Sequence, residues 1–211
     1  MLTACGASPF KVQNLAKTDI DMVADAHYRE TEVLLRKLTV KLYKRNPREL
    51  HKSRFQTIDR RVAQLFDIPG RLQFAELPVT GTAAIELSMD PAYGGDRVFA
   101  LMVGLTDMIR ESYGYHTEFF MFSELDAQKL YHSARNIEIA LWRIARSDDG
   151  SGRPLLLTNS WQGERRNLSY ERLFGKLIAL QDMLASIMAE KNQRVIKTVA
   201  QNVATMAFIP L

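Results

Sequence analysis

The sequence predicts an all-α protein, an irregular bundle of about five substantial helices with one long loop that contains proline and glycine. In several segments apolar residues recur at three- and four-residue steps, the spacing that places them on one face of a helix. Serine, threonine or aspartate stands just before several of these segments, as helix N-caps do. The stretch DIPGRLQFAELPVTGT at 67–82 holds two prolines and two glycines, which excludes a long helix there and predicts the loop.

The first predicted helix begins at Thr18, which forms a capping-box pattern with Asp21. We expect it to end at Asn46-Pro47, because the residue before a proline avoids helical backbone geometry. A shorter helix is expected over 58–66, with the preceding threonine as its cap. The apolar face expected for the first helix consists of Ile20, Val23, His27, Thr31, Leu34, Leu38 and Leu42.

The later helices follow the same pattern. Residues 83–88 fit a helical turn, and Asp96 is the expected cap of a helix with one apolar face. Ser123 is the expected cap of a helix that runs to Ser147, and the last block begins at about Ser169. The apolar face expected for the helix after Asp96 consists of Val98, Leu101, Met102, Leu105, Met108 and Ile109. A further apolar face is expected after the last helical block, and it consists of Val195, Ile196, Val199, Val203 and Met206.

Two connecting segments are also predicted from composition. SDDGSGRP at 147–154 is typical of an exposed turn and is the expected site of proteolytic nicking. The four residues 155–158, LLLT, are expected to be extended.

Composition limits the function classes. Hydrophobic residues make up 46% of the 211 residues and charged residues 25%, which is typical of a globular protein. The net charge of +4 is mildly basic, well below the charge typical of nucleic-acid binding. One cysteine excludes an intrachain disulfide framework and a multi-cysteine metal site. The most apolar run, VFALMVGL at 98–105, is too short to span a membrane and predicts a buried helix.

No motif in the chain predicts a catalytic residue, a cofactor site or a metal site. The four histidines form neither an HExxH motif nor the Glu-x-x-His pairs of a di-iron bundle, and no Gly-x-Ser-x-Gly turn is present. His27 lies on an apolar face and is expected in the core or at its boundary. A pairing of His116 with Glu111 or Glu118 is the alternative that sequence alone leaves open.

Two segments carry weak functional signals. KLYKRNPRELHKSR at 41–54 is either a solvated helix end, where cations offset the helix dipole, or a contact for an anionic partner. ESYGYHTEFFMF at 111–122 is aromatic but flanked by acidic residues, so we expect a hydrophobic plug between helices instead of a nucleic-acid contact. Trp142 and Trp161 are expected to pack similarly. The possible anionic-partner contacts are Lys44, Arg45, Arg48 and Lys52.

The sole cysteine, Cys5, lies in the opening MLTACGASPF. Leu2-Thr3-Ala4-Cys5 resembles the lipobox of bacterial lipoproteins, which implies a diacylglycerol on the Cys5 thiol and cleavage before it. Gly6 resembles the residue of lipoproteins sorted to the outer membrane. A secretory signal needs a basic segment and about 7–15 apolar residues, whereas only four residues precede Cys5 in this sequence. We therefore interpret residues 1–10 as a truncated signal, lipobox and tether, and 11–211 as a single helical domain.

These observations predict a lipid-anchored, non-enzymatic helical envelope protein that acts as a scaffold or interaction module. The body resembles uncharacterised proteobacterial outer-membrane lipoproteins, which implies no activity. The expected location is the periplasmic face of the outer membrane, and the expected partner is an envelope protein or a cell-wall component. Nucleic acid and a small-molecule substrate are not expected. The alternative, if Met1 is the true start, is a cytoplasmic helical adaptor that binds an acidic partner or nucleic acid through 41–54. An enzyme with an unrecognised constellation is the third hypothesis.

Overall fold

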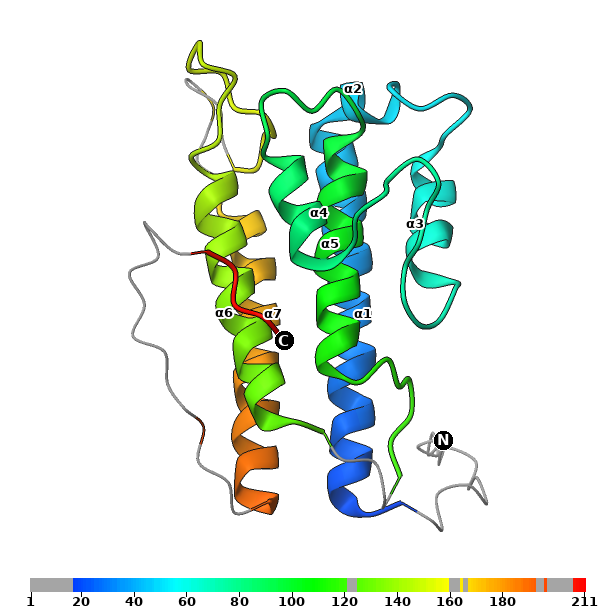
Figure 1. Cartoon of the computed structure of the whole chain (residues 1–211), viewed down its shortest axis with the longest axis vertical. Coiled ribbons are helices and arrows are strands. Elements are labelled where there is room, and N and C mark those ends of the chain that lie inside the picture. Colours follow the sequence, from blue (N-terminus) through cyan, green and yellow to red (C-terminus); the bar gives the residue numbers. More distant parts are fainter. Residues whose placement is uncertain (1–16, 121–124, 160–163, 165–166, 193–195, 197–206) are drawn as a thin grey trace, which may run out of the picture.

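The computed structural model describes residues 17–120, 125–159, 164, 167–192, 196 and 207–211, which form seven helices and no sheet. Four long helices lie side by side along the long axis of the molecule (Figure 1): α1 (Asp19–Arg45), α5 (Arg97–Ser112), α6 (Ala127–Ile144) and α7 (Ser169–Lys191). Contacts from α1 to α5, α5 to α6, α6 to α7 and α7 to α1 close them into a four-helix bundle. The predicted all-α class is therefore confirmed.

Helix α1 begins as its sequence predicts. The Thr18 hydroxyl accepts a hydrogen bond from the Asp21 backbone N–H (3.2 Å), and the Asp21 carboxylate accepts one from the Thr18 N–H (2.8 Å). The expected apolar face is wrong at Val23, which is 37% exposed. The buried stripe there passes through Ala24 and Asp25, because the Asp25 carboxylate accepts a hydrogen bond from the backbone N–H of Phe119 (2.8 Å).

Helix α1 ends at Asn46-Pro47 as predicted, and the chain continues in two short helices. Proline occupies the first position of α2 (Pro47–Leu50), where its missing N–H breaks no helical hydrogen bond. Helix α3 (Ile58–Phe66) has the predicted bounds, and its Thr57 cap accepts a hydrogen bond from the backbone N–H of Arg60 (3.2 Å).

Helix α5 is the centre of the molecule, with every residue except Glu111 buried. The single apolar face predicted for it is therefore too narrow. The bundle covers one side of α5, and α4 (Gly81–Ser88) and α3 pack on the rest. Close packing of α4 depends on Gly104, because a Cβ there would lie 2.6 Å from the Gly81 carbonyl oxygen and 2.7 Å from the Ile85 nitrogen.

The boundaries of α6 differ from the prediction. Asp126 is its cap, and the Asp126 carboxylate accepts a hydrogen bond from the backbone N–H of Gln128 (2.8 Å). The predicted cap, Ser123, lies outside the described residues, and the helix ends at Ile144 instead of Ser147. Helix α7 begins at Ser169 as predicted, while the face expected over 195–206 lies outside the described residues apart from Ile196.

The predicted loop and turn are confirmed, but the segment predicted to be extended, 155–158, bends at residues 155 and 156. The 67–80 segment is a loop with one isolated bridge, between Phe74 and Leu77, and the predicted turn at 147–154 closes with a second bridge, between Asp148 and Pro154. The predicted aromatic plug is confirmed within its described part. The Tyr113 ring packs edge-on against Tyr28 at 5.2 Å between centroids, and Phe119 packs against the same two rings.

Candidate functional site

The strongest concentration of buried charge lies around Arg61, whose side chain is fully buried between α3 and α5. Its guanidinium donates two hydrogen bonds to the Glu76 carboxylate (2.5 and 3.0 Å) and lies 3.8 Å from the centre of the Phe99 ring. Its Nε lies 3.4 Å from Asp96 Oδ2, which also accepts a hydrogen bond from the Tyr43 hydroxyl (2.8 Å). Sequence analysis did not find this cluster.

Asp96 lies at the centre of this cluster and also caps α5. Its Oδ1 accepts a hydrogen bond from the backbone N–H of Phe99 (2.9 Å). Burial raises the pKa of Asp96 to about 6, although the donors on Phe99 and Tyr43 and the charge of Arg61 oppose that rise. A carboxyl group that titrates near neutrality is a feature of some active sites. Here the described partners of the Asp96 carboxylate are the Phe99 main chain, the Tyr43 hydroxyl and the Arg61 guanidinium, so its position indicates a structural role.

Three other buried charged groups hold loops onto α5. Arg97 donates to the backbone carbonyls of Ser88, Asp90, Pro91 and Tyr93. Arg110 donates to the carbonyls of Ile68 (2.8 Å) and Gly70 (3.2 Å), and the Asp107 carboxylate accepts from the Leu72 N–H (3.0 Å). Burial raises the pKa of Asp107 as well. Most of the hydrogen bonds of these groups go to the main chain of neighbouring loops, and Arg110 also pairs with Glu32 (3.2 Å), so we interpret all three as groups that fasten loops to α5.

The two histidines considered from the sequence, His27 and His116, occupy different environments. His27 lies at the core boundary as expected, with Nδ1 3.3 Å from the Leu180 carbonyl oxygen. His116 packs against the Phe119 ring, and no contact with Glu111 or Glu118 is found in the described part of the chain. Nor do the described residues contain a group of three or more His, Cys, Asp or Glu side chains that could hold a metal ion.

The structure divides the four predicted anionic-partner contacts into two kinds. Lys52 donates to the buried Glu49 carboxylate (2.7 Å) and to the Gly95 carbonyl (3.1 Å), and Arg48 donates to the Leu155 carbonyl (3.2 Å). These two side chains therefore support the local fold. Arg45 forms an ion pair with Glu164, and Lys44 is exposed at the surface.

Two adjoining clefts lie beside these residues, with volumes of about 250 and 260 Å³, and both are lined by Glu164. Their described linings contain one carboxylate and five cations, which we name the basic surface: Lys41, Lys44, Arg45, Arg48 and Arg153. Burial lowers the pKa of Lys41, and the charges of Arg172 and Arg45 lower it further. Lys41 therefore lies close to other positive charges, a condition that favours binding of an anion.

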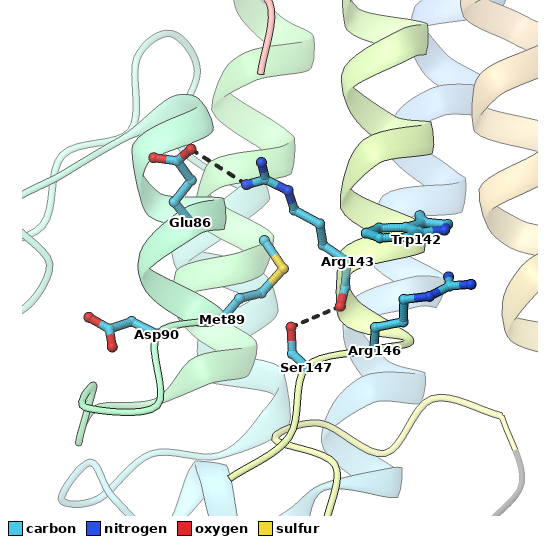
Figure 2. Close-up of a pocket in the computed structure, with 7 residues that line it drawn as sticks. All are labelled: Glu86, Met89, Asp90, Trp142, Arg143, Arg146 and Ser147. Carbon is cyan, nitrogen blue, oxygen red and sulfur yellow. Dashed lines mark hydrogen bonds and ion pairs between the residues drawn. The ribbon is translucent and has the colours of Figure 1, made fainter. Parts of the chain in front are cut away.

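A third cleft, of about 350 Å³, lies between the ends of α4 and α6 (Figure 2). Arg143 reaches across it from α6 toward Glu86 on α4, with 3.6 Å between the guanidinium and the carboxylate. The Arg146 guanidinium lies 4.1 Å from the centre of the Trp142 ring. Trp142 is thus half-buried beside a cleft, where we had expected it to pack between helices, and Trp161 lies outside the described residues.

Residues 207–211 form an extended segment that lies against α6 (red in Figure 1). The buried Asn136 amide donates to the Ile209 carbonyl (2.8 Å) and accepts from the Ile209 N–H (2.7 Å). The Pro210 carbonyl lies 2.9 Å from His132 Nδ1, and the Phe208 ring lies 4.9 Å from the Arg143 guanidinium carbon. Sequence analysis missed this contact, although the proline in AFIPL is a signal for extended backbone.

The predicted lipidation site, Cys5, lies outside the described residues. No described helix combines the length and the apolar character that crossing a membrane requires. Comparison with family models, with curated proteins and with solved structures gave no match.

Proposed function

We propose that this protein is a non-enzymatic helical interaction module that docks an acidic surface of a partner protein on its basic surface. The observation that carries the proposal is the lining of the two adjoining clefts, where five cations accompany a single carboxylate. Charge of one sign around a concave surface concentrates ligands of the opposite sign and speeds their encounter.

The surroundings of the cations favour a protein partner over a nucleic acid. The same clefts contain Glu164 and the amides of Asn159 and Asn167, which can accept as well as donate hydrogen bonds. A mixture of charges and amides of this kind is typical of protein interfaces.

The test is a charge reversal at the two lysines of the basic surface, Lys41→Glu with Lys44→Glu. Arg48 and Lys52 are left unchanged because they support the fold. A matched control reverses Lys129 and Lys176, which changes the net charge equally on α6 and α7. We expect the first variant, and not the control, to lose binding to immobilised poly-L-glutamate.

Binding to poly-L-glutamate should also weaken with added salt, because exposed charges are screened beyond about 8–10 Å at physiological ionic strength. Equal binding by the two variants would refute a docking role and leave the cations as a solvated helix end. Stronger retention on duplex DNA than on poly-L-glutamate would favour nucleic acid as the partner.

We also propose that the module is held at the bacterial envelope through a lipid on Cys5, as the lipobox resemblance implies. Expression of the gene with its upstream codons should give a protein that carries acyl label and fractionates with membranes. Cys5→Ser should abolish the label. A wild-type protein that is unlabelled and absent from the membrane fraction would instead favour the cytoplasmic adaptor, which would use the same basic surface.

A further inference from the structure

The contact between residues 207–211 and α6 is built mainly from the segment's main chain. Asn136 forms a two-bond pair with the N–H and the carbonyl of Ile209, the same pairing that a neighbouring β-strand would supply. Since every residue except proline offers this N–H and carbonyl, the pair accepts an extended segment of almost any sequence. An asparagine that is fully buried on a helix needs such a partner, because an unpaired buried amide is costly.

His132 extends the pairing by one residue. A carbonyl oxygen can only accept a hydrogen bond, so the 2.9 Å contact places the imidazole proton on Nδ1, which donates to the Pro210 carbonyl. The other ring nitrogen, Nε2, then accepts from the Gln128 amide nitrogen, 2.7 Å away. This chain of donors fixes the ring and aligns it with the main chain of the segment.

Side-chain contacts add a sequence preference to this main-chain pairing. The Phe208 ring lies beside the Arg143 guanidinium, and Phe208 and Leu211 pack on the edge of the hydrophobic core. Pro210 has no N–H to leave unpaired, and its ring points to solvent. The peptide pattern expected at this contact is therefore that of residues 208–211 themselves: two apolar residues, a proline and a further apolar residue, of which the first and the last pack on the core.

This segment lies at the edge of the core and not within it. Phe208, Ile209 and Leu211 are only half-buried and Pro210 is exposed, whereas the core-facing residues of α6 are almost fully buried. A segment added to a bundle that is already packed can leave at a smaller cost than a helix of the bundle.

We propose that α6 carries a peptide-binding face, formed by His132, Asn136 and Arg143, whose ligand is an extended apolar–apolar–proline–apolar segment of a partner protein. Residues 207–211 occupy this face in cis and compete with the partner. The segment runs antiparallel to α6, from Arg143 toward His132. Arg143 also lines the α4–α6 cleft (Figure 2).

The test measures binding of Ala-Phe-Ile-Pro-Leu-amide, labelled with carboxyfluorescein on its N-terminal amine, by fluorescence anisotropy. The proteins compared are the wild type, a variant that lacks residues 207–211, and Ile209→Pro. The last substitution removes the backbone N–H that donates a hydrogen bond to the Asn136 side-chain oxygen. A tethered segment competes at an effective concentration near the millimolar range. Both variants should therefore bind the peptide at least about ten-fold more tightly than the wild type does.

Asn136→Ala in the shortened protein should lower the affinity by at least about ten-fold, because the two main-chain hydrogen bonds are lost. The matched control is Asn159→Ala, which removes an amide that bonds Glu171 on another part of the surface and should leave binding unchanged. A labelled peptide with proline in place of the isoleucine should bind more weakly for the same reason as Asn136→Ala.

Three results would overturn the proposal. One is equal affinity of the wild type and both variants for the peptide, or no binding by any of them. Another is loss of helical circular dichroism in the shortened protein, which would make 207–211 part of the core. The third is a concentration-dependent dimer of the wild type in analytical ultracentrifugation that disappears in the shortened protein, which would identify a second copy as the occupant.

Discussion

Gly104→Ala should destabilise the protein although alanine favours helices. The new Cβ would lie 2.6 Å from the Gly81 carbonyl oxygen, 2.6 Å from Ile85 Cγ1 and 2.7 Å from the Ile85 nitrogen. Two of these three atoms belong to the main chain of α4 and cannot rotate away. Helix α4 must therefore move off α5, and Ile85, now fully buried, must lose part of its packing.

The size of the effect is the difference between two opposing terms. Overpacking of a core typically costs about 1–3 kcal/mol, and partial exposure of an isoleucine adds to that cost. Replacing a glycine by alanine inside a helix gains about 1 kcal/mol. We expect Gly104→Ala to lower the free energy of unfolding by about 2 kcal/mol, which for a chain of this length lowers Tm by about 4–8 °C.

Urea unfolding followed by far-ultraviolet circular dichroism measures this free energy. Gly175→Ala in α7 is the matched control, because no heavy atom outside its own helix turn lies within 4 Å of a Cβ placed there. The control should raise the free energy of unfolding by about 0.5–1 kcal/mol. A Gly104→Ala protein as stable as the wild type would refute the close packing of α4 on α5.

Three further changes test the polar contacts. In the folded wild type Asp96 keeps its proton up to about pH 6, whereas in the unfolded chain it loses the proton near pH 4. The free energy of unfolding of the wild type should therefore fall relative to that of Asp96→Asn, by up to about 3 kcal/mol between pH 4 and 7. Urea unfolding across that range measures it, and a constant difference would contradict the buried titration. Tyr43→Phe should cost about 1–2 kcal/mol at pH 7, because Asp96 loses a donor. Asn46→Ala removes both hydrogen bonds to the Leu157 main chain and should speed tryptic cleavage after Arg146, at the start of the 147–154 turn, with Asn159→Ala as a control that should not.

Local signals predicted the starts of α1, α3 and α5 because the cap of each helix bonds within its own first turn. Thr18, Thr57 and Asp96 all accept a hydrogen bond from a backbone N–H three residues ahead, so the evidence for each lies in four consecutive residues. Periodicity failed where burial depends on distant partners. Asp107 and Arg110 have the character of a solvent face, but both are buried because they bond the 68–72 loop.

The candidate sites were predictable only in part. The composition of residues 41–54 predicted the basic stretch. It could not predict which cations are exposed and which support the fold, because Arg48 and Lys52 bond atoms more than forty positions away in the chain. Arg153, which lines one of the two clefts, comes from a different segment of the chain. The contact between Asn136 and Ile209 spans 73 positions, which no local pattern encodes.

Both proposed surfaces include the same arrangement, an asparagine that pairs with the main chain of a non-helical segment. Asn46 pairs with the N–H and carbonyl of Leu157 (2.7 and 2.9 Å), and Asn136 pairs with those of Ile209. The described part of the chain has no sheet, so a non-helical segment that docks on it must satisfy its main-chain groups through side chains, the main chain of loops or water. The first pair positions Leu157 in the wall of the basic surface. The second occupies the α6 face, so substitution of either asparagine should alter a binding surface while leaving the four-helix bundle intact.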